Sequence, residues 1–188
     1  IPSLFHQQDD RKRVLIALNI DQIVRHIARF VKEQNEERQE AVFDKDQPIG
    51  STAYMRTWYT TKPNGPTQKS QISHVVYDSS WEALGTFALD YSDNVQAYAK
   101  NDHLNFSVLY VFNGVVRKFF PDFLIRLSNG KTLVLEVKGE DSEQNQAKRD
   151  AMKTWVKAVN EKSGFGTWAF EVIFNPSQIQ DALAKHGG

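Results

Sequence analysis

The chain of 188 residues contains no cysteine, which excludes disulfide bonds and zinc sites built on thiolates. No apolar run reaches the ~18 residues that a membrane-spanning helix needs. No Gly-x-x-x-x-Gly-Lys-Ser/Thr loop occurs, so an NTPase motor is not expected within this sequence. A zinc site built on histidines is also not expected, because no two of the five lie at ligand spacing: His6, His26, His74, His103 and His186. These absences favour a cytoplasmic protein without membrane contact.

The net charge is zero, with 23 basic and 23 acidic residues. A protein that coats nucleic acid needs a Lys or Arg for each phosphate contact, so this balance argues against such a protein. Hydrophobic residues make up 40% of the chain, which is enough to bury a core and argues against disorder. The length suggests one domain plus an appendage. The first residue is Ile1 and not Met, from which we expect a piece of a longer protein.

Residues 119–138, FFPDFLIRLSNGKTLVLEVK, contain two apolar runs separated by a Ser-Asn-Gly triplet. This pattern predicts two antiparallel strands joined by a three-residue loop, with Gly130 in the left-handed conformation. Leu127 then faces Lys131, and the same register places Asp122 directly opposite Glu136.

Two carboxylates that face each other across a strand pair repel, and the apolar residues around them make the repulsion stronger. A divalent cation between them would relieve it, and carboxylate oxygens are ligands that Mg²⁺ prefers. Period-two alternation places Lys138 on the same face as Glu136. The trio predicts a site for phosphodiester hydrolysis, although an ordinary ion-pair network with Arg117, Arg126 or Lys138 is an open alternative.

Pro121-Asp122 followed by Glu136-Val137-Lys138 resembles the signature of the PD-(D/E)XK nuclease superfamily. Five segments taken in order resemble the C-terminal endonuclease domain of type III restriction enzyme restriction (Res) subunits. They are SWE at 80–82, AYAKN at 97–101, PDFL at 121–124, LEVKG at 135–139 and WVKAVN at 155–160. The likeness covers roughly residues 50–175 and leaves the N-terminal quarter unmatched.

The resemblance implies an α/β fold with a restriction-endonuclease-like core, in which helices flank a mixed central sheet. It implies a Mg²⁺-dependent DNA endonuclease whose metal is held by Asp122, Glu136, the carbonyl of Val137 and Glu82. The parent chain would carry an ATP-driven motor, so ATP would belong to that motor alone. Partners would be DNA and a methyltransferase/specificity subunit in a prokaryotic cytoplasm, and cutting both strands would require a dimer.

Further candidates surround this trio, each with a purely structural alternative. Lys138 would orient the attacking water or simply pair with Glu136, and Glu82 would bind metal or form a capping box with Ser79. Substrate phosphate contacts are predicted for Lys100, Asn101, Asn105, Gln146 and Lys148. Asn105 is included because the Asn113-Gly114 turn would align it with Asp122, and Gln146 and Lys148, like Gln144, because they open a helix.

Periodicity and turn residues predict the order of elements. Residues 1–46 form a helical extension with a helix at 11–42, and residues 47–188 form the endonuclease domain after a linker at 44–51. Strands are expected at 52–61, 71–77, 104–112, 115–127, 131–138 and 167–174. Helices are expected at 79–91, 94–100, 145–162 and 176–186, with Trp81, Leu84, Ala88 and Leu89 facing inward in the first and Ser177 capping the last.

Two other functions stay open at this level. One is a non-catalytic DNA-binding or scaffolding domain with a nuclease-like fold, which the zero net charge favours slightly. The other is a stand-alone, structure-specific nuclease for branched or RNA substrates, which would act without a partner subunit.

Overall fold

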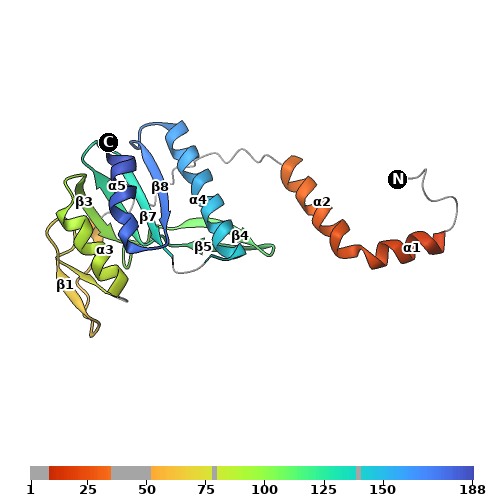
Figure 1. The fold of residues 1–188 in the computed structure, drawn as a ribbon, viewed down its shortest axis with the longest axis horizontal. Coiled ribbons are helices and arrows are strands. Elements are labelled where there is room, and N and C mark those ends of the chain that lie inside the picture. The colour runs from red at the N-terminus through yellow and green to blue at the C-terminus, as the bar shows by residue number, and fades with distance from the viewer. Residues whose placement is uncertain (1–8, 35–51, 78–79, 139–140) are drawn as a thin grey trace. The chain divides into compact units, whose positions relative to one another are not determined.

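The computed structural model describes residues 9–34, 52–77, 80–138 and 141–188. The chain divides into two compact units, Ile1–Arg38 and Gln39–Gly188 (Figure 1). Within the described residues, no helix is long and apolar enough to cross a membrane.

The first unit contains helices α1 (Asp9–Leu18) and α2 (Ile20–Gln34). The sequence predicted one helix at 11–42, whereas the helix is interrupted at Asn19, whose side chain donates a hydrogen bond to the carbonyl of Leu15 (2.9 Å). Residues 35–42 of the predicted helix lie outside the described residues, as does the predicted linker at 44–51.

The second unit is a mixed α/β fold around a four-stranded sheet with the order β3-β6-β7-β8. Strands β3 (Val95–Lys100), β6 (Phe123–Leu127) and β7 (Thr132–Val137) are antiparallel neighbours. Strand β8 (Trp168–Ile173) runs parallel to β7, and the connection between them is helix α4 (Glu143–Lys162). The predicted mixed central sheet flanked by helices is therefore confirmed.

Each face of this sheet has its own apolar core. On one face, Phe123, Ile125 and Leu133 pack against helices α3 (Ser80–Tyr91) and α5 (Ile179–Gly187). On the other face, Val134 packs with Met152 of α4 and with a separate hairpin of β4 (Val108–Phe112) and β5 (Val115–Phe119). Because side chains alternate along a strand, the even-numbered positions of β7 point toward the α4 face.

The Ser-Asn-Gly loop forms as predicted. Phe123 pairs with Leu135 and Arg126 with Thr132, which is the predicted register. The backbone N–H of Leu127 donates to the carbonyl of Lys131 (2.8 Å), and Gly130 has a φ of +84°, which glycine adopts without steric cost.

The Asn113-Gly114 turn also gives the predicted register, with Phe112 paired to Val115. The predicted strand 115–127, however, is two strands, β5 and β6, in different sheets. Pro121 lies at the break, where its missing N–H removes a ladder hydrogen bond.

The third antiparallel strand of the central sheet is β3, which the sequence predicted as a helix at 94–100. This prediction is wrong because pairing with β6 and burial of Val95, Tyr98 and Ala99 determine the conformation of this segment. A bulge between Val95 and Ala97 also breaks the alternation by which a strand is recognised.

The strand predicted at 52–61 is wrong. A short 3-10 helix, η2 (Thr52–Tyr54), is followed by irregular chain. Strand β1 (Asn64–Pro66) lies between the strands predicted at 52–61 and 71–77 and pairs with β2 (His74–Val76) in a two-stranded sheet. An isolated bridge between Ser70 and Tyr98 joins this region to β3.

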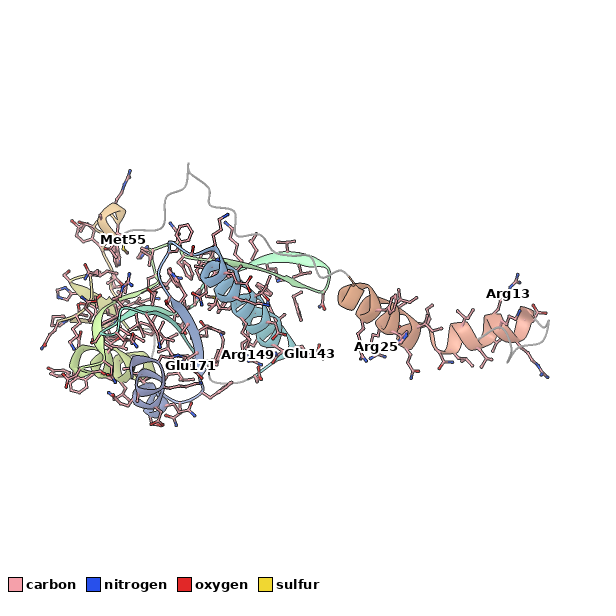
Figure 2. All side chains as sticks on the ribbon, turned by 90° about the horizontal axis from the view of Figure 1, so that it is seen from above. Arg13, Arg25, Met55, Glu143, Arg149 and Glu171 are labelled. Carbon is pink, nitrogen blue, oxygen red and sulfur yellow. The ribbon has the colours of Figure 1, made fainter. Side chains whose placement is uncertain are left out.

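The C-terminal elements follow the prediction with small corrections. Ser142 caps α4 by accepting from the N–H of Asn145 (3.2 Å), so the helix begins at Glu143 and not at 145 (Figure 2). The closing helix is η3 (Pro176–Gln178) followed by α5, and its cap is Asn175, not Ser177. Asn175 accepts from the N–H of Ser177 (3.0 Å), so the predicted cap is a donor to the real one.

One helix provides a test of the core. Leu89 of α3 is fully buried, whereas Leu84, predicted to face inward on the same helix, is 62% exposed. The side chain of Trp81 lies outside the described part of the chain.

We expect Leu89→Ala to lower the free energy of unfolding by about 2–5 kcal/mol, because it removes buried methyl groups and leaves a cavity. Leu84→Ala is the matched control and should change it by no more than about 0.5 kcal/mol. Urea denaturation measures both. An equal loss in the two variants would contradict the placement of α3.

Candidate functional site

Asp122 and Glu136 meet across the β6–β7 pair, as the register predicted. Asp122 directly precedes β6, and Glu136 is the penultimate residue of β7. The Oδ2 atom of Asp122 accepts a hydrogen bond from the N–H of Val137 (2.7 Å). In return, the N–H of Asp122 donates to Oε2 of Glu136 (3.1 Å). Each carboxylate is thus held by the backbone of the opposite strand.

Glu136 is only 3% exposed, and its environment disfavours the charged form. Burial, and then the negative charge of Asp122, raise the pKa of Glu136 from 4.5 to about 7. Lys138 and the N–H of Asp122 act in the opposite direction and lower the pKa. In the cation-free protein this pair of carboxylates therefore retains a proton close to neutral pH.

Lys138 lies on the same face as the two acids, and its ammonium forms an ion pair with Oε1 of Glu136. Its side chain is 21% exposed, so it borders solvent while Glu136 does not. Of the arginines considered as alternative partners, Arg126 donates to the carbonyl of Gly130 (2.8 Å) at the far end of the hairpin. Arg117 is an exposed residue of β5.

A cavity of about 430 Å³ opens beside Asp122. Its lining includes exposed residues such as Asn105 and Phe120, so solvent enters from this side. Neither Glu136 nor Lys138 is among the lining residues, so a ligand in this cavity meets Asp122 first. The described lining residues are Lys100, Asn101, Asp102, Asn105, Phe120, Pro121 and Asp122.

Asn101 fixes the position of Asp122. Its side-chain amide donates to the carbonyls of Pro121 (2.9 Å) and Phe106 (2.7 Å), and its Oδ1 accepts from the N–H of Phe106 (3.1 Å). Its backbone N–H donates to the carbonyl of Asp122 (2.8 Å). Asn101 is 8% exposed, so it acts as a clamp within the protein and does not present its amide as the predicted phosphate contact.

Lys100, also predicted to contact phosphate, lines the cavity but is only 5% exposed. Its ammonium donates to the carbonyl of Val76 (2.9 Å) and pairs with Asp102 (3.3 Å). Asn105 lies in the same cavity lining as Asp122, as expected, although the β4–β5 ladder ends at Val108 and Phe119 and does not extend to it.

The residues predicted at the start of α4 are not brought to this cavity. Gln146 donates to Asp150 (2.9 Å) one turn further along the helix. The ammonium of Lys148 lies 5.5 Å from the centroid of the Phe119 ring. Gln144 donates to the hydroxyl of Tyr110 (2.6 Å). The contacts of Lys148 and Gln144 join α4 to the β4–β5 hairpin.

Glu82, the fourth predicted metal ligand, belongs to α3, but its side chain and Ser79 lie outside the described residues. Within the described part of the chain, no group of three or more His, Asp or Glu side chains is placed to hold a metal ion. A cation at this site would therefore depend on two carboxylates, with backbone and water completing the shell, a ligand set that suits Mg²⁺.

Three residues of the cavity lining, Asp102, Phe120 and Pro121, were not among the predicted site residues. Pro121 was the available signal. A proline within a predicted strand ends the ladder, and the residues on either side of the break then turn out of the sheet.

Comparison with protein-family models, with curated proteins and with solved structures found no match. A reaction assigned to this site therefore depends on the chemistry of its own residues.

Proposed function

We propose that the second unit is a metal-dependent DNA endonuclease with a PD-(D/E)XK core. The observation that carries this proposal is the pair of opposed carboxylates, Asp122 and Glu136, with Lys138 in an ion pair on the same face. The element order gives further support. Apart from the β4–β5 hairpin, which is inserted between β3 and β6, the order is helix α3, antiparallel strands β3, β6 and β7, helix α4 and the parallel strand β8, and this is the order that the family resemblance implies.

The residues fit a divalent cation. Two carboxylates lie close together in a largely buried place, and their mutual repulsion contributes to the raised pKa of Glu136. A cation held by Asp122, Glu136 and the carbonyl of Val137, with Glu82 as a further candidate, would remove that repulsion. When bound there, Mg²⁺ would lower the pKa of a coordinated water and neutralise charge on a phosphate.

The protein's own groups supply positioning. Lys138 borders solvent next to the acids, so its ammonium is placed to hold the attacking water and to stabilise negative charge on the scissile phosphate. Asn101 fixes the Pro121–Asp122 segment before substrate arrives. Such preorganisation lowers the cost of reaching the reactive geometry.

In its full form the proposal makes this unit the cleavage module of a type III-like restriction-modification enzyme. DNA is then the substrate, and a motor domain in the same polypeptide would use ATP. A methyltransferase/specificity subunit would choose the site, and two copies would cut both strands.

We expect the protein to nick supercoiled plasmid in Mg²⁺, and Asp122→Asn, Glu136→Gln and Lys138→Ala each to reduce the rate by at least about a hundredfold. Asp122→Asn and Glu136→Gln remove charges that would hold the cation, and Lys138→Ala removes the ammonium that would stabilise negative charge on the phosphate. Lys185→Ala is the matched control, because it breaks another lysine–glutamate pair of the same unit, Lys185 with Glu171 (2.7 Å).

Nicking that survives all three site variants would contradict the proposal, as would an equal loss in Lys185→Ala. Circular dichroism of each variant separates lost chemistry from lost folding.

A second prediction concerns pH. The pKa of Glu136 is raised on folding, so its contribution to stability is full below about pH 4.5 and is lost as the pH rises through about 7. In metal-free buffer, the free energy of unfolding of Glu136→Gln should therefore rise relative to that of the parent by up to about 3 kcal/mol between about pH 5 and pH 8. Denaturation in EDTA at the two pH values measures this gain.

Adding Mg²⁺ should raise the stability of the parent more at the higher pH, because the cation favours the ionised pair. Asp122→Asn should show little of this increase. If the difference in the free energy of unfolding between Glu136→Gln and the parent does not change with pH, the pKa of Glu136 is not raised on folding.

A further inference from the structure

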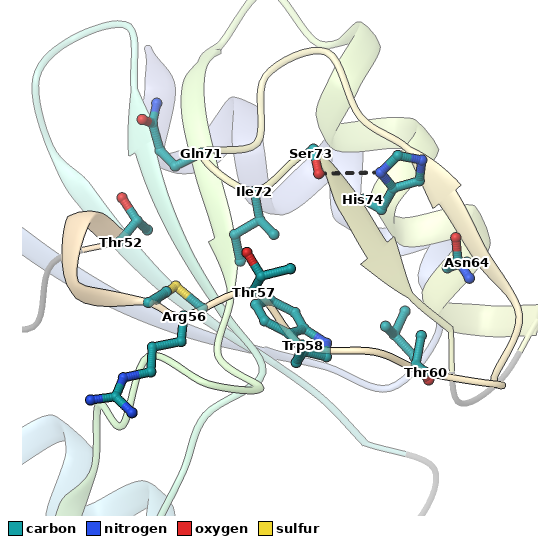
Figure 3. Close-up of a pocket in the computed structure, with 12 residues that line it drawn as sticks. Thr52, Arg56, Thr57, Trp58, Thr60, Asn64, Gln71, Ile72, Ser73 and His74 are labelled. Atoms are coloured by element: carbon teal, nitrogen blue, oxygen red, sulfur yellow. Dashed lines mark hydrogen bonds between the residues drawn. The ribbon is translucent and has the colours of Figure 1, made fainter.

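A second cavity of about 440 Å³ lies between η2, the chain that follows it and strand β2 (Figure 3). Four hydroxyl side chains and two amides line it, together with Arg56, His74 and Trp58. No Asp or Glu is among its lining residues. In Figure 3, Ser73 and His74 share a hydrogen bond (3.2 Å).

This lining suits one nucleotide. An aromatic ring stacks on a base, hydroxyls and amides bind base edges and sugar, and a guanidinium binds phosphate. None of the described lining residues is a carboxylate, and Arg56 supplies a positive charge for an anionic ligand. The volume is within the range of small-ligand pockets.

Two contacts join this cavity to the one beside Asp122. The carbonyl of Val76, which lines the second cavity, accepts the hydrogen bond of Lys100, which lines the first (2.9 Å). The ring centroids of Trp58 and His103 are 4.2 Å apart. His103 directly follows Asp102, which lines the first cavity. The linings of the two cavities are therefore in contact at the Val76–Lys100 hydrogen bond.

The chain segment that contributes Gln71 to the second cavity is anchored to the central sheet. The N–H of Gln71 donates to the carbonyl of Tyr98 (3.0 Å), and the N–H of Tyr98 donates to the carbonyl of Lys69 (3.1 Å). Tyr98 belongs to β3, and the same strand ends at Lys100 beside Asp122. Backbone hydrogen bonds thus connect the lining of the second cavity to the strand that ends beside the candidate catalytic pair.

We infer that this second cavity binds an unpaired nucleotide of the strand whose phosphate lies at Asp122, Glu136 and Lys138, an inference that rests on the proposed function. The nucleotide is unpaired because both faces of a base within a duplex are covered by its neighbours, whereas stacking on Trp58 requires an uncovered face. The substrate class is nucleic acid with a gap, flap or extruded base next to the cleaved bond.

The test measures binding without cleavage. The full chain in EDTA is titrated against two fluorescein-labelled DNA duplexes of equal length, one fully paired and one with a short single-stranded gap, and anisotropy is recorded. The protein should bind the gapped duplex more tightly. Trp58→Ala should weaken that binding by at least about fivefold, Arg56→Gln should weaken it in the same direction, and Trp58→Phe should retain most of it.

Tyr59→Ala is the matched control. Tyr59 is the neighbouring aromatic residue, is 97% exposed and does not line the cavity, so its loss should change the affinity by less than about twofold. Thermal unfolding of each variant tests folding, and Arg56→Gln removes an exposed charge without disturbing the Trp58–His103 contact.

The inference is overturned if the parent does not prefer the gapped duplex or binds neither duplex, if Trp58→Ala and Arg56→Gln bind like the parent, or if Tyr59→Ala loses as much as Trp58→Ala. Plasmid nicking separates it from the proposed function. Nicking without a Trp58-dependent preference overturns the inference alone, and Trp58-dependent binding without any hydrolysis overturns the nuclease alone.

Discussion

The reciprocal hydrogen bonds between Asp122 and the end of β7 are the interaction on which the site depends. The N–H of Val137 holds one carboxylate, and the N–H of Asp122 holds the other. These bonds keep two acids together where Coulomb repulsion and burial both oppose it. Under the proposed function, a cation bound between the two acids would relieve this repulsion.

The surrounding fold serves this pair in a simple way. The short β6–β7 loop fixes the register, and Asn101 ties the segment before β6 to the end of β3. Pro121 lies in the break between β5 and β6, so Asp122 precedes β6 and borders a cavity instead of the apolar core. Glu136 is buried while Lys138 borders solvent. A carboxyl group with a raised pKa therefore lies next to an ammonium group that is open to solvent.

The sequence predicted the parts of this arrangement that depend on turn chemistry. Ser-Asn-Gly and Asn-Gly fix their own loop lengths, so both hairpin registers follow from a few residues, and with them the meeting of Asp122 and Glu136. Strand β3 could not be predicted in this way, because its conformation comes from pairing with β6 and its bulge hides the alternation. The roles of Lys100 and Asn101 were also out of reach, since their partners, Val76 and Pro121, are defined only once the chain has folded.

The most direct test of the central claim is calorimetric titration of Mg²⁺ into the protein just below pH 7, in buffers that differ in ionisation enthalpy. If the cation binds between Asp122 and Glu136, it must displace the proton that the raised pKa of Glu136 retains. We expect roughly half a proton to be released per ion bound in the parent and none in Glu136→Gln. Binding without proton release, or binding unchanged in Asp122→Asn, would contradict the account.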